Sequence, residues 1–333
     1  MLKAGLKIIC FLISITFLIS PQAFPQTRQE KEEKTLEVKR LKESYRPSKI
    51  YSTAGVFFGY DSNVNLSSTR KGDLFEEFLF SLSFSKPLPR NWGFYFDYDL
   101  DVLNYNQYTE NSNILNHLRF TLYKRFFPFK VGAGYNLHIF NYPHNRHEDF
   151  IFHRGFVYLA LLSRNIYQRL EFQAGIKDYT DEKALGDTIT TFQDKERLDR
   201  RTSIEYLLKA RLSPKLILRL GLRFSKNNSN CRYVDFYDYH AWRHLLGLDW
   251  RAQRNLVLFS SIIHIKKDYN SRTVTLRPYT QKDNLYAGNV GLRYRLNAKN
   301  TFSLYYTYRE NSSNDPLQEY SESIIGCGWQ YKF

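Results

Sequence analysis

Three carboxylates recur at every second position in one short segment of the chain. Asp97, Asp99 and Asp101 alternate with aromatic and aliphatic residues in the run WGFYFDYDLDVL. Side chains two residues apart lie on the same face of an extended strand, so the three aspartates form a ladder. Like charges this close repel each other, and they are too costly to place against lipid. The ladder must therefore face the interior of the structure, where basic side chains can pair with it.

Basic side chains occupy the equivalent positions of other alternating segments. The set comprises Arg119, Arg125, Lys209, Arg211, Arg219, Arg223, Arg243, Arg293, Arg295 and Arg309. Two roles are open for it. The arginines either pair with the aspartates and brace the wall, or their excess makes a pore selective for anions. We favour bracing combined with a mild preference for anions.

The segments that carry these charges alternate between apolar and polar residues with a period of two. In KLILRLGLRFSK, for example, Leu216, Leu218 and Leu220 share one face. Arg219 and Arg223 lie on the other face. In a transmembrane β-barrel the apolar face meets lipid and the polar face lines the lumen. We identify about fourteen such segments, with twelve or sixteen as the alternatives. They lie near 50–62, 73–85, 91–105, 112–125, 128–141, 150–163, 166–180, 199–212, 215–227, 235–251, 254–268, 283–296, 300–310 and 319–333.

Short and long connections alternate between these segments. KPLPRN, FFPFK and LNAKN are short, whereas NQYTENS and the stretch 181–198 are longer and more polar. This alternation is typical of barrels with periplasmic turns and extracellular loops. We therefore predict an all-β fold, a transmembrane up-and-down antiparallel β-barrel in the outer membrane of a Gram-negative-type cell. An even number of strands places both termini in the periplasm.

The beginning of the chain has the composition of an export signal. Lys3 and Lys7 precede the apolar run IICFLISITFLIS. This run is shorter than the roughly 20 residues of a membrane helix. Retention of this segment as an anchor helix is the alternative. We predict a signal peptide at 1–23, a charged periplasmic lead-in at 24–48 and the barrel at 49–333.

Composition argues against several other classes of protein. The formal net charge is +15 and 17% of the residues are aromatic. No run of about 18 apolar residues follows the signal, which argues against helical membrane spans. The two cysteines beyond the signal, Cys231 and Cys327, do not form a disulfide framework. Nucleic acid is not an expected partner, because arginines and aromatic rings lie on opposite faces of the strands, whereas a nucleic-acid platform combines them on one surface.

The last eight residues of the sequence form the alternating stretch GCGWQYKF. Trp329, Tyr331 and Phe333 share one face of this stretch, and a glycine and two polar residues take the positions between and before them. The last strand is expected to pair with the first, because closure removes the exposed sheet edges. The ring-rich face then meets lipid, where Trp and Tyr suit the inner aromatic girdle. A terminal aromatic residue on an alternating strand also resembles the signal by which the barrel-assembly machinery recognises outer-membrane barrels.

The first expected strand runs into the stretch FFGYDSNVNLSS. This stretch resembles the opening of the barrel in the surface lipoprotein assembly modifier family, and the matching residues are Tyr60, Asp61, Ser62, Asn63, Val64 and Asn65. The resemblance implies a fourteen-stranded barrel that helps lipoproteins reach the cell surface. That family usually carries helical repeats before its barrel, whereas this chain has only the charged lead-in. The alternative is that Asp-Ser-Asn simply makes a good turn at a strand end.

Bond chemistry is not expected of the same stretch. The outer-membrane phospholipases have a similar run in which a His activates the Ser, but here Tyr60 takes the place of that His and Val64 the place of a Gly. A phenol with a pKa near 10 is a poor base at pH 7. The loop HNRHED at 144–149 lacks the remote ligands of a strong metal site. We predict no enzyme activity, no cofactor and no metal.

Three functions remain compatible with such a barrel. The first is passage or assembly of cargo across the outer membrane, with a lipoprotein as the cargo that the family resemblance implies. The second is a passive channel with a mild preference for anions or acidic saccharides. The third is a structural or adhesin-like barrel whose loops carry the function. In each case the surrounding partner is outer-membrane lipid.

Overall fold

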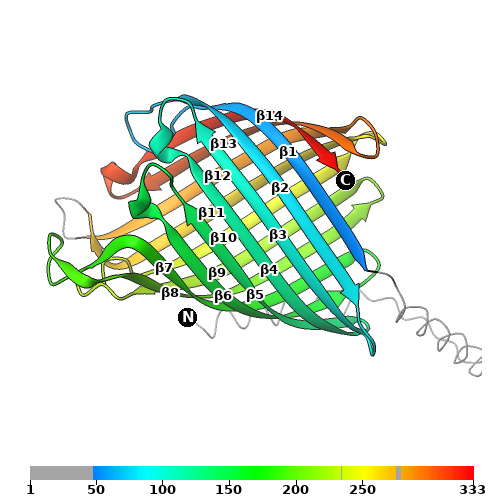
Figure 1. Cartoon of the computed structure of the whole chain (residues 1–333), viewed down its shortest axis with the longest axis horizontal. Helices are drawn as coiled ribbons and strands as arrows, with labels where there is room; N and C mark the ends of the chain where they lie inside the picture. The colour runs from blue at the N-terminus through cyan, green and yellow to red at the C-terminus, as the bar shows by residue number, and fades with distance from the viewer. Residues whose placement is uncertain (1–47, 234, 275–278) are drawn as a thin grey trace, which may run out of the picture. The chain divides into compact units, whose positions relative to one another are not determined.

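The computed structural model describes residues 48–233, 235–274 and 279–333. Within these residues, fourteen antiparallel strands form one closed barrel in which β1 pairs with β14 and every other strand pairs with its neighbours in sequence (Figure 1). This arrangement confirms the predicted fold class and the strand number. The expected signal peptide at 1–23 and all but the last residue of the expected lead-in lie outside the described residues.

The strands are mostly 13 to 16 residues long, and three of them are longer. Their bounds are β1 Lys49–Asp61, β2 Asp73–Pro87, β3 Trp92–Tyr105, β4 Asn113–Phe126, β5 Phe129–Asn141, β6 Phe150–Leu162, β7 Ile166–Leu185, β8 Phe192–Ser213, β9 Leu216–Ser229, β10 Tyr239–Arg251, β11 Leu256–Thr273, β12 Thr280–Arg295, β13 Asn300–Ser313 and β14 Tyr320–Lys332. Short 3-10 turns occur at Thr109–Asn111, Arg146–Glu148 and Pro316–Gln318. No helix within the described residues is long and apolar enough to cross a membrane.

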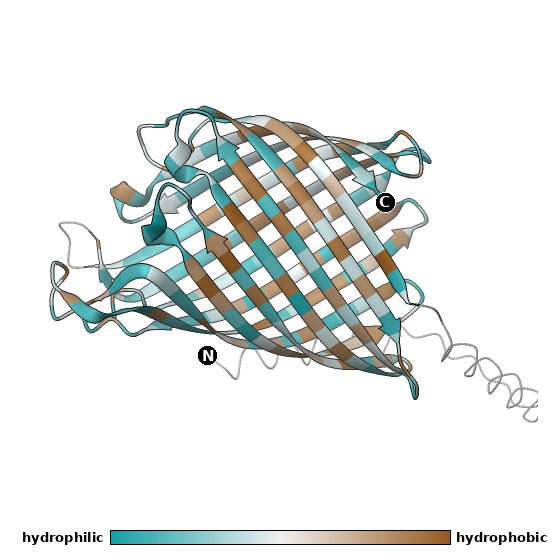
Figure 2. Ribbon diagram, viewed as in Figure 1, coloured by the Kyte–Doolittle hydropathy of each residue, from teal (hydrophilic) through white to brown (hydrophobic). Residues whose placement is uncertain are grey.

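Hydropathy alternates along the strands (Figure 2). Many large apolar side chains are exposed at alternate positions of the strands. Phe58, Val157 and Ile262 are more than half exposed, as expected of side chains that meet lipid. Directly paired residues of neighbouring strands lie on the same face of the sheet, so the partner of an outward residue also points outward. Starting from these residues, the pairing divides the residues of every strand into those that face outward and those that face the lumen.

Outward aromatic residues gather toward both ends of the barrel. Trp92, Phe126, Trp250, Tyr294, Phe302 and Trp329 lie near the short turns, and Tyr60, Trp242, Tyr286, Tyr306 and Tyr308 lie toward the longer connections. Aromatic rings of this kind sit where the hydrocarbon core meets the headgroups. The apolar band between the two groups gives the span that the membrane covers.

Short and long connections alternate along the barrel as the sequence predicts. The short turns lie near the C-terminus at one end, and the longer connections lie at the opposite end (Figure 1). One expected loop is different, because β7 continues to Leu185 and β8 begins at Phe192. Most of the stretch 181–198 is thus a strand extension with bulges, and only 186–191 connect the two strands. Strand β10, in turn, begins at Tyr239, four residues later than the alternation predicts.

Inward-facing rings pack onto glycines of the neighbouring strand. The ring of Tyr123 on β4 covers Gly93 on β3 so closely that a Cβ atom at Gly93 would overlap it. Tyr158 on β6 covers Gly132 on β5 in the same way. Since only glycine leaves room for such a contact, these pairs favour the observed register of β3 with β4 and of β5 with β6.

The alternation of connections yields a test of the orientation in the membrane. We expect a cysteine at Thr188, between β7 and β8, to react with a membrane-impermeant maleimide on intact cells. A cysteine at Ala298, in the short turn between β12 and β13, should react only after the outer membrane is opened. Both positions are exposed in the barrel, so access to the compartment decides the labelling. The parent protein with its native cysteines is the control, and the opposite labelling pattern would contradict the orientation.

Candidate functional site

The lumen collects the charges that the sequence singles out. Register and parity place the aspartate ladder of β3 on the inward face, with Asp97 opposite Arg119 and Asp99 opposite His117 of β4. The same criterion places the other predicted basic residues on inward faces. Those on β9, β12 and β13 are Arg219, Arg223, Arg293, Arg295 and Arg309, and Arg125, Lys209, Arg211 and Arg243 lie on β4, β8 and β10. The site is therefore the wall of the lumen.

The aspartate ladder makes few contacts with the arginines. His117 Nδ1 lies 3.3 Å from an Asp99 oxygen. Asp101 lies between two leucines of the neighbouring strands. Arg119, opposite Asp97, instead directs its guanidinium to Glu171, at 3.4 Å. Among the described residues, no ion pair joins the three aspartates to any arginine.

Several predicted arginines are braced by carboxylates that the sequence did not single out. Asp249 on β10 lies 2.9 Å from Arg219 and 3.5 Å from Arg293, so it links β9 to β12. Arg309 lies 3.1 Å from the buried Glu322 of β14. Arg223 donates a hydrogen bond to an amide oxygen rather than to a carboxylate. Bracing and unpaired charge thus coexist in the same wall.

The densest group of cations surrounds two neighbouring residues of β7. Glu171 is 1% exposed and lies 3.4 Å from Arg119 and 3.5 Å from Arg169. Two residues along β7, the amide oxygen of Gln173 accepts hydrogen bonds from Arg154 at 3.0 Å and Arg223 at 3.4 Å, and from a serine hydroxyl. Four guanidinium groups thus contact one carboxylate and one amide, and a second inward carboxylate, Glu205, lies opposite Glu171 and Arg223. Cations outnumber carboxylates in this part of the wall.

Aromatic rings support a series of cations along β4 to β8. The series, which we name the cation ladder, consists of Lys130, Arg119, Arg154, Arg201 and Lys177. Lys130 Nζ lies 3.8 Å from the centre of the Tyr123 ring, Arg119 4.3 Å from Phe156, and Lys177 3.6 Å from Phe150. A ring face attracts a cation without neutralising it. The ladder is therefore held in place by contacts that add no opposing charge.

One part of the wall carries carboxylates without basic side chains. Inward positions of β2 and β3 carry Asp73, Glu77 and the aspartate ladder, and they carry no lysine or arginine. The next strand, β4, already belongs to the basic part. A solute in the lumen therefore meets an acidic wall on β2 and β3. From β4 onward it meets a wall on which basic side chains outnumber carboxylates such as Glu171, Asp249 and Glu322.

A separate cluster fastens the extension of β7 and β8. Arg197 binds Glu182 and Asp199, each at 2.9 Å, and its guanidinium lies 3.4 Å from the ring centre of Tyr237. The hydroxyl of Tyr237 donates to Glu182 at 3.1 Å. Burial and the adjacent Glu182 carboxylate raise the pKa of Tyr237 to about 12, so the phenol stays a donor at neutral pH. This cluster joins the extension to the connection between β9 and β10.

The stretch Tyr60–Asn65 fastens the first long connection to two strands. Asn63 is fully buried, and its amide donates to the carbonyls of Ser67 and Ser321 at 2.8 and 2.9 Å. The Asp61 carboxylate accepts from the Asn63 backbone and from the hydroxyl of Tyr105. Tyr60 points outward, and Val64 is buried in the connection. The last residue of the stretch, Asn65, is exposed and accepts from Asn111.

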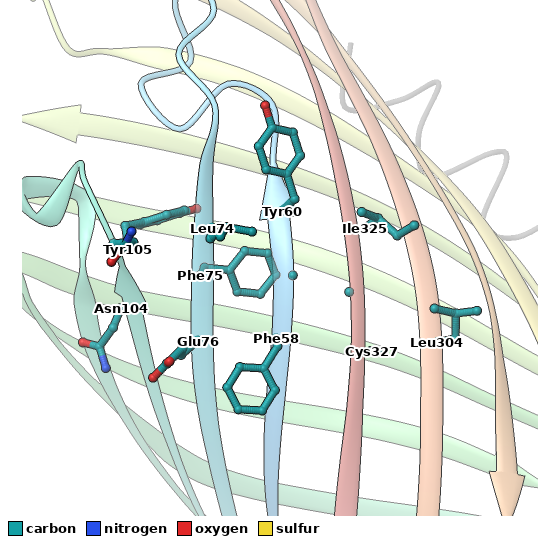
Figure 3. Close-up of a pocket in the computed structure, with 13 residues that line it drawn as sticks. Phe58, Tyr60, Leu74, Phe75, Glu76, Asn104, Tyr105, Leu304, Ile325 and Cys327 are labelled. Carbon is teal, nitrogen blue, oxygen red and sulfur yellow. The ribbon is translucent and has the colours of Figure 1, made fainter.

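A groove of about 770 Å³ lies on the wall where the barrel closes. Its lining includes the outward Phe58, Tyr60, Leu74 and Ile325, with the polar side chain of Glu76 at one side (Figure 3). We name the pairing of β1 with β14 the closing seam. It contains nine residue pairs, from Thr53–Lys332 to Asp61–Ile324, and is the shortest pairing in the barrel described.

The terminal aromatic residues face outward near the short turns. Trp329 is exposed on the wall, and its indole nitrogen donates to Asn300 at 2.9 Å. The rings of Tyr331 and Phe333 meet edge to face, with their centres 5.0 Å apart. Their role as an assembly signal stays a prediction.

Sequence reasoning also raised the loop at 144–149 as a possible cation site. The Asp149 carboxylate there accepts hydrogen bonds from the Tyr142 backbone and from Asn141. In the part of the chain that the structure describes, no three His, Cys, Asp or Glu side chains are grouped to hold a metal ion.

The closed fourteen-strand sheet, its apolar outer face and its charged lumen define an outer-membrane β-barrel. No protein-family model matches the chain, and no curated protein matches it. Solved outer-membrane barrels share the fold. OmpT of Vibrio cholerae matches with a TM-score of 0.52 and 9% identity over 86% of this chain and 97% of its own. The outer membrane channel DcaP of Acinetobacter baumannii gives 0.53 and 8% over 86% and 97%. An anion-selective porin from Comamonas acidovorans gives 0.51 and 8% over 86% and 99%.

The contacts of Asn63 predict a local effect of its loss. We expect Asn63→Ala to cost about 1–3 kcal/mol of stability, because it removes a buried amide and leaves the partly buried carbonyls of Ser67 and Ser321 without this donor. The connection between β1 and β2 should then open more often, and trypsin should cleave sooner after Arg70 and Lys71.

The matched control is Asn65→Ala, at an exposed position of the same stretch. The measurement is the rate of trypsin cleavage of the folded protein in detergent, followed by gel mobility with and without heating. Equal cleavage rates for the two variants would contradict the anchoring role of Asn63.

Proposed function

We propose that this barrel is an outer-membrane channel for small anionic solutes, including acidic saccharides. The cation ladder carries the proposal, because it places five basic groups on neighbouring strands of the lumen and holds most of them on aromatic rings instead of carboxylates. In the proposed orientation both termini lie in the periplasm and the longer connections lie outside the cell.

Exposure of the lumen arginines supports access by solutes. The side chains of Arg119 and Arg201 are 24% and 32% exposed, and those of Arg219 and Arg293 are 37% and 47% exposed. Water thus reaches these inward guanidinium groups. A lumen lined by one sign of charge raises the local concentration of ions of the opposite sign. The effect decreases with salt, because added ions screen it.

The acidic wall of β2 and β3 limits this preference. Its carboxylates repel anions and attract cations, so the lumen is not uniformly positive. A solute with charges of both signs would be oriented between the two walls. We therefore propose a mild rather than strict preference for anions, and passage without bond chemistry.

Selectivity should depend on the cations that lack carboxylate partners. We expect the combined change of Lys130, Arg154 and Arg223 to Gln to shift the reversal potential in a salt gradient away from the anion side, while single-channel conductance persists. Within the described part of the chain these three residues form no ion pair, so the barrel should remain folded. The measurement is planar-bilayer recording of the refolded full chain.

Two comparisons sharpen this experiment. Lys124→Gln is the control for position, because Lys124 points outward and one positive charge is removed outside the lumen. It is compared with Lys130→Gln alone, which removes one charge inside the lumen. Changing the three ladder aspartates to Asn should shift the reversal potential in the opposite direction. Unchanged selectivity in the triple Gln variant would leave the basic side chains as wall supports only, and the channel proposal would lose its basis.

A second candidate is translocation of lipoproteins, which the resemblance to the surface lipoprotein assembly modifier family implies. The closing seam favours it, since the shortest strand pairing of the barrel lies beside a groove on the outer wall. A seam that opens toward lipid could release an acylated chain sideways. The hydrogen bonds of Asn63 explain the matching stretch without a client, so this candidate ranks second.

The chain offers a simple lock for the closing seam. Phe58 lies directly opposite Cys327 across the seam, and Leu304 lies opposite the same cysteine on β13. Cross-strand pairs have the separation that a disulfide requires. If the seam opens for cargo, oxidised Phe58→Cys should reduce the fraction of lipoprotein that proteinase K reaches on intact cells, and a reductant should restore it.

Leu304→Cys forms the matched bridge to the same cysteine within an ordinary strand pair. It should leave lipoprotein exposure unchanged. Equal exposure in both oxidised variants would exclude opening of the seam, while conductance of the locked barrel would still report on the channel.

A further inference from the structure

Charged side chains on the outward face of the barrel are few and unevenly placed. Among the paired positions outside the bulged strand extensions, Lys86 and Lys124 are the outward cations near the short turns in the described strands. Toward the longer connections, the outward cations are Arg200, Lys226, Lys266 and Lys282, and all four are exposed. We name these four residues the outer basic row.

The outer basic row occupies one side of the barrel. Its members lie on β8, β9, β11 and β12, and β10 contributes His240, which is paired with Lys226. At the same end, the paired outward positions of β1 to β6, β13 and β14, and of β7 before its bulge, carry no lysine or arginine; they carry Glu76, Asp178 and Glu310. The outer wall is thus basic on one side and weakly acidic on the other.

Intramolecular partners do not account for the row. Asp268 is the carboxylate on this side, and it lies 4.0 Å from Lys266, with both side chains well exposed. An exposed pair at this distance contributes little to stability. On β7, Ile176 lies opposite Arg200, and Asp178 is the next outward residue. No ion pair joins Asp178 to Arg200. Four cations therefore face the outside with one weak acidic partner.

The position of the row suggests its ligand. Beside and below it, toward the middle of the membrane, the outward positions hold Phe224, Trp242 and Tyr286. The next outward positions hold Leu222, the stacked rings of His244 and His264, and then Leu246 and Ile262. Cations directly above an aromatic and apolar band lie at headgroup depth, where long side chains extend to anionic groups. The chemistry that fits is a phosphate-bearing headgroup with acyl chains below it.

We propose that the outer basic row binds the phosphate groups of a lipid A-type glycolipid in the outer leaflet. From β8 to β12 the row spans four strand spacings, or about 19 Å. This width suits a lipid with several phosphates and many acyl chains better than a phospholipid with one phosphate. The row thereby gives the barrel a preferred side for the outer-leaflet glycolipid.

The test uses the refolded full chain in detergent, with bisphosphorylated lipid A as the probe and native mass spectrometry as the readout. We expect the four-fold variant R200Q/K226Q/K266Q/K282Q to lose roughly fivefold in affinity for each charge removed. The variant R200K/K226R/K266R/K282R keeps all charges and should retain binding. The control K86Q/K124Q removes outward cations at the other end and should also retain it.

Equal affinity of the four-fold Gln variant and the parent would overturn the proposal. Equal retention of phosphatidylglycerol and lipid A by the parent would overturn the choice of glycolipid, and so would unchanged binding of dephosphorylated lipid A. Heat-dependent gel mobility shows whether each variant is folded. Because the row faces outward, the Gln variant should keep the reversal potential of the parent, which separates this result from the channel proposal.

Discussion

The structure depends on one constraint, which is that no backbone polar group can remain unpaired inside a bilayer. The sheet meets it by closing β1 onto β14, so that every strand has two neighbours. Closure then divides the side chains into two sets with opposite surroundings. Apolar residues and rings face lipid. Charged residues such as the aspartate ladder face the lumen, because the closed sheet has only these two faces. The charged lining of the lumen thus follows from the closed pattern of backbone hydrogen bonds.

Within the lumen, bracing and availability for solutes are divided between different side chains. Asp249 and Glu322 hold arginines near the two ends of the barrel, and Glu171 holds two more at its centre. The cation ladder relies mainly on aromatic rings, which fix the position of a charge without neutralising it. Stability and electrostatic function can therefore be changed separately, and an arginine cannot be assigned a role from its inward direction alone.

The sequence predicts strand number and facing well, because a period of two reports directly on which side chains meet lipid. It predicts partners poorly. Asp97 and Arg119 are opposite each other, yet Arg119 binds Glu171, further along the chain on β7, and only the register and curvature of the closed sheet bring these two together. The alternation of apolar and polar residues also does not predict the extension of β7 and β8. Beyond the membrane its charged residues pair with each other, as Arg197 does with Glu182, and apolar alternation disappears.

The rings that cover glycines on neighbouring strands affect how this barrel can diverge. Tyr123 needs the bare backbone of Gly93, and Gly93 leaves a hollow without that ring. A substitution at either position alone is therefore unfavourable, although the two residues lie on different strands. Neutral change would have to pass through an intermediate with a clash or a void, so the two sites should evolve as a pair. A few such pairs can preserve the strand register while the rest of the sequence changes.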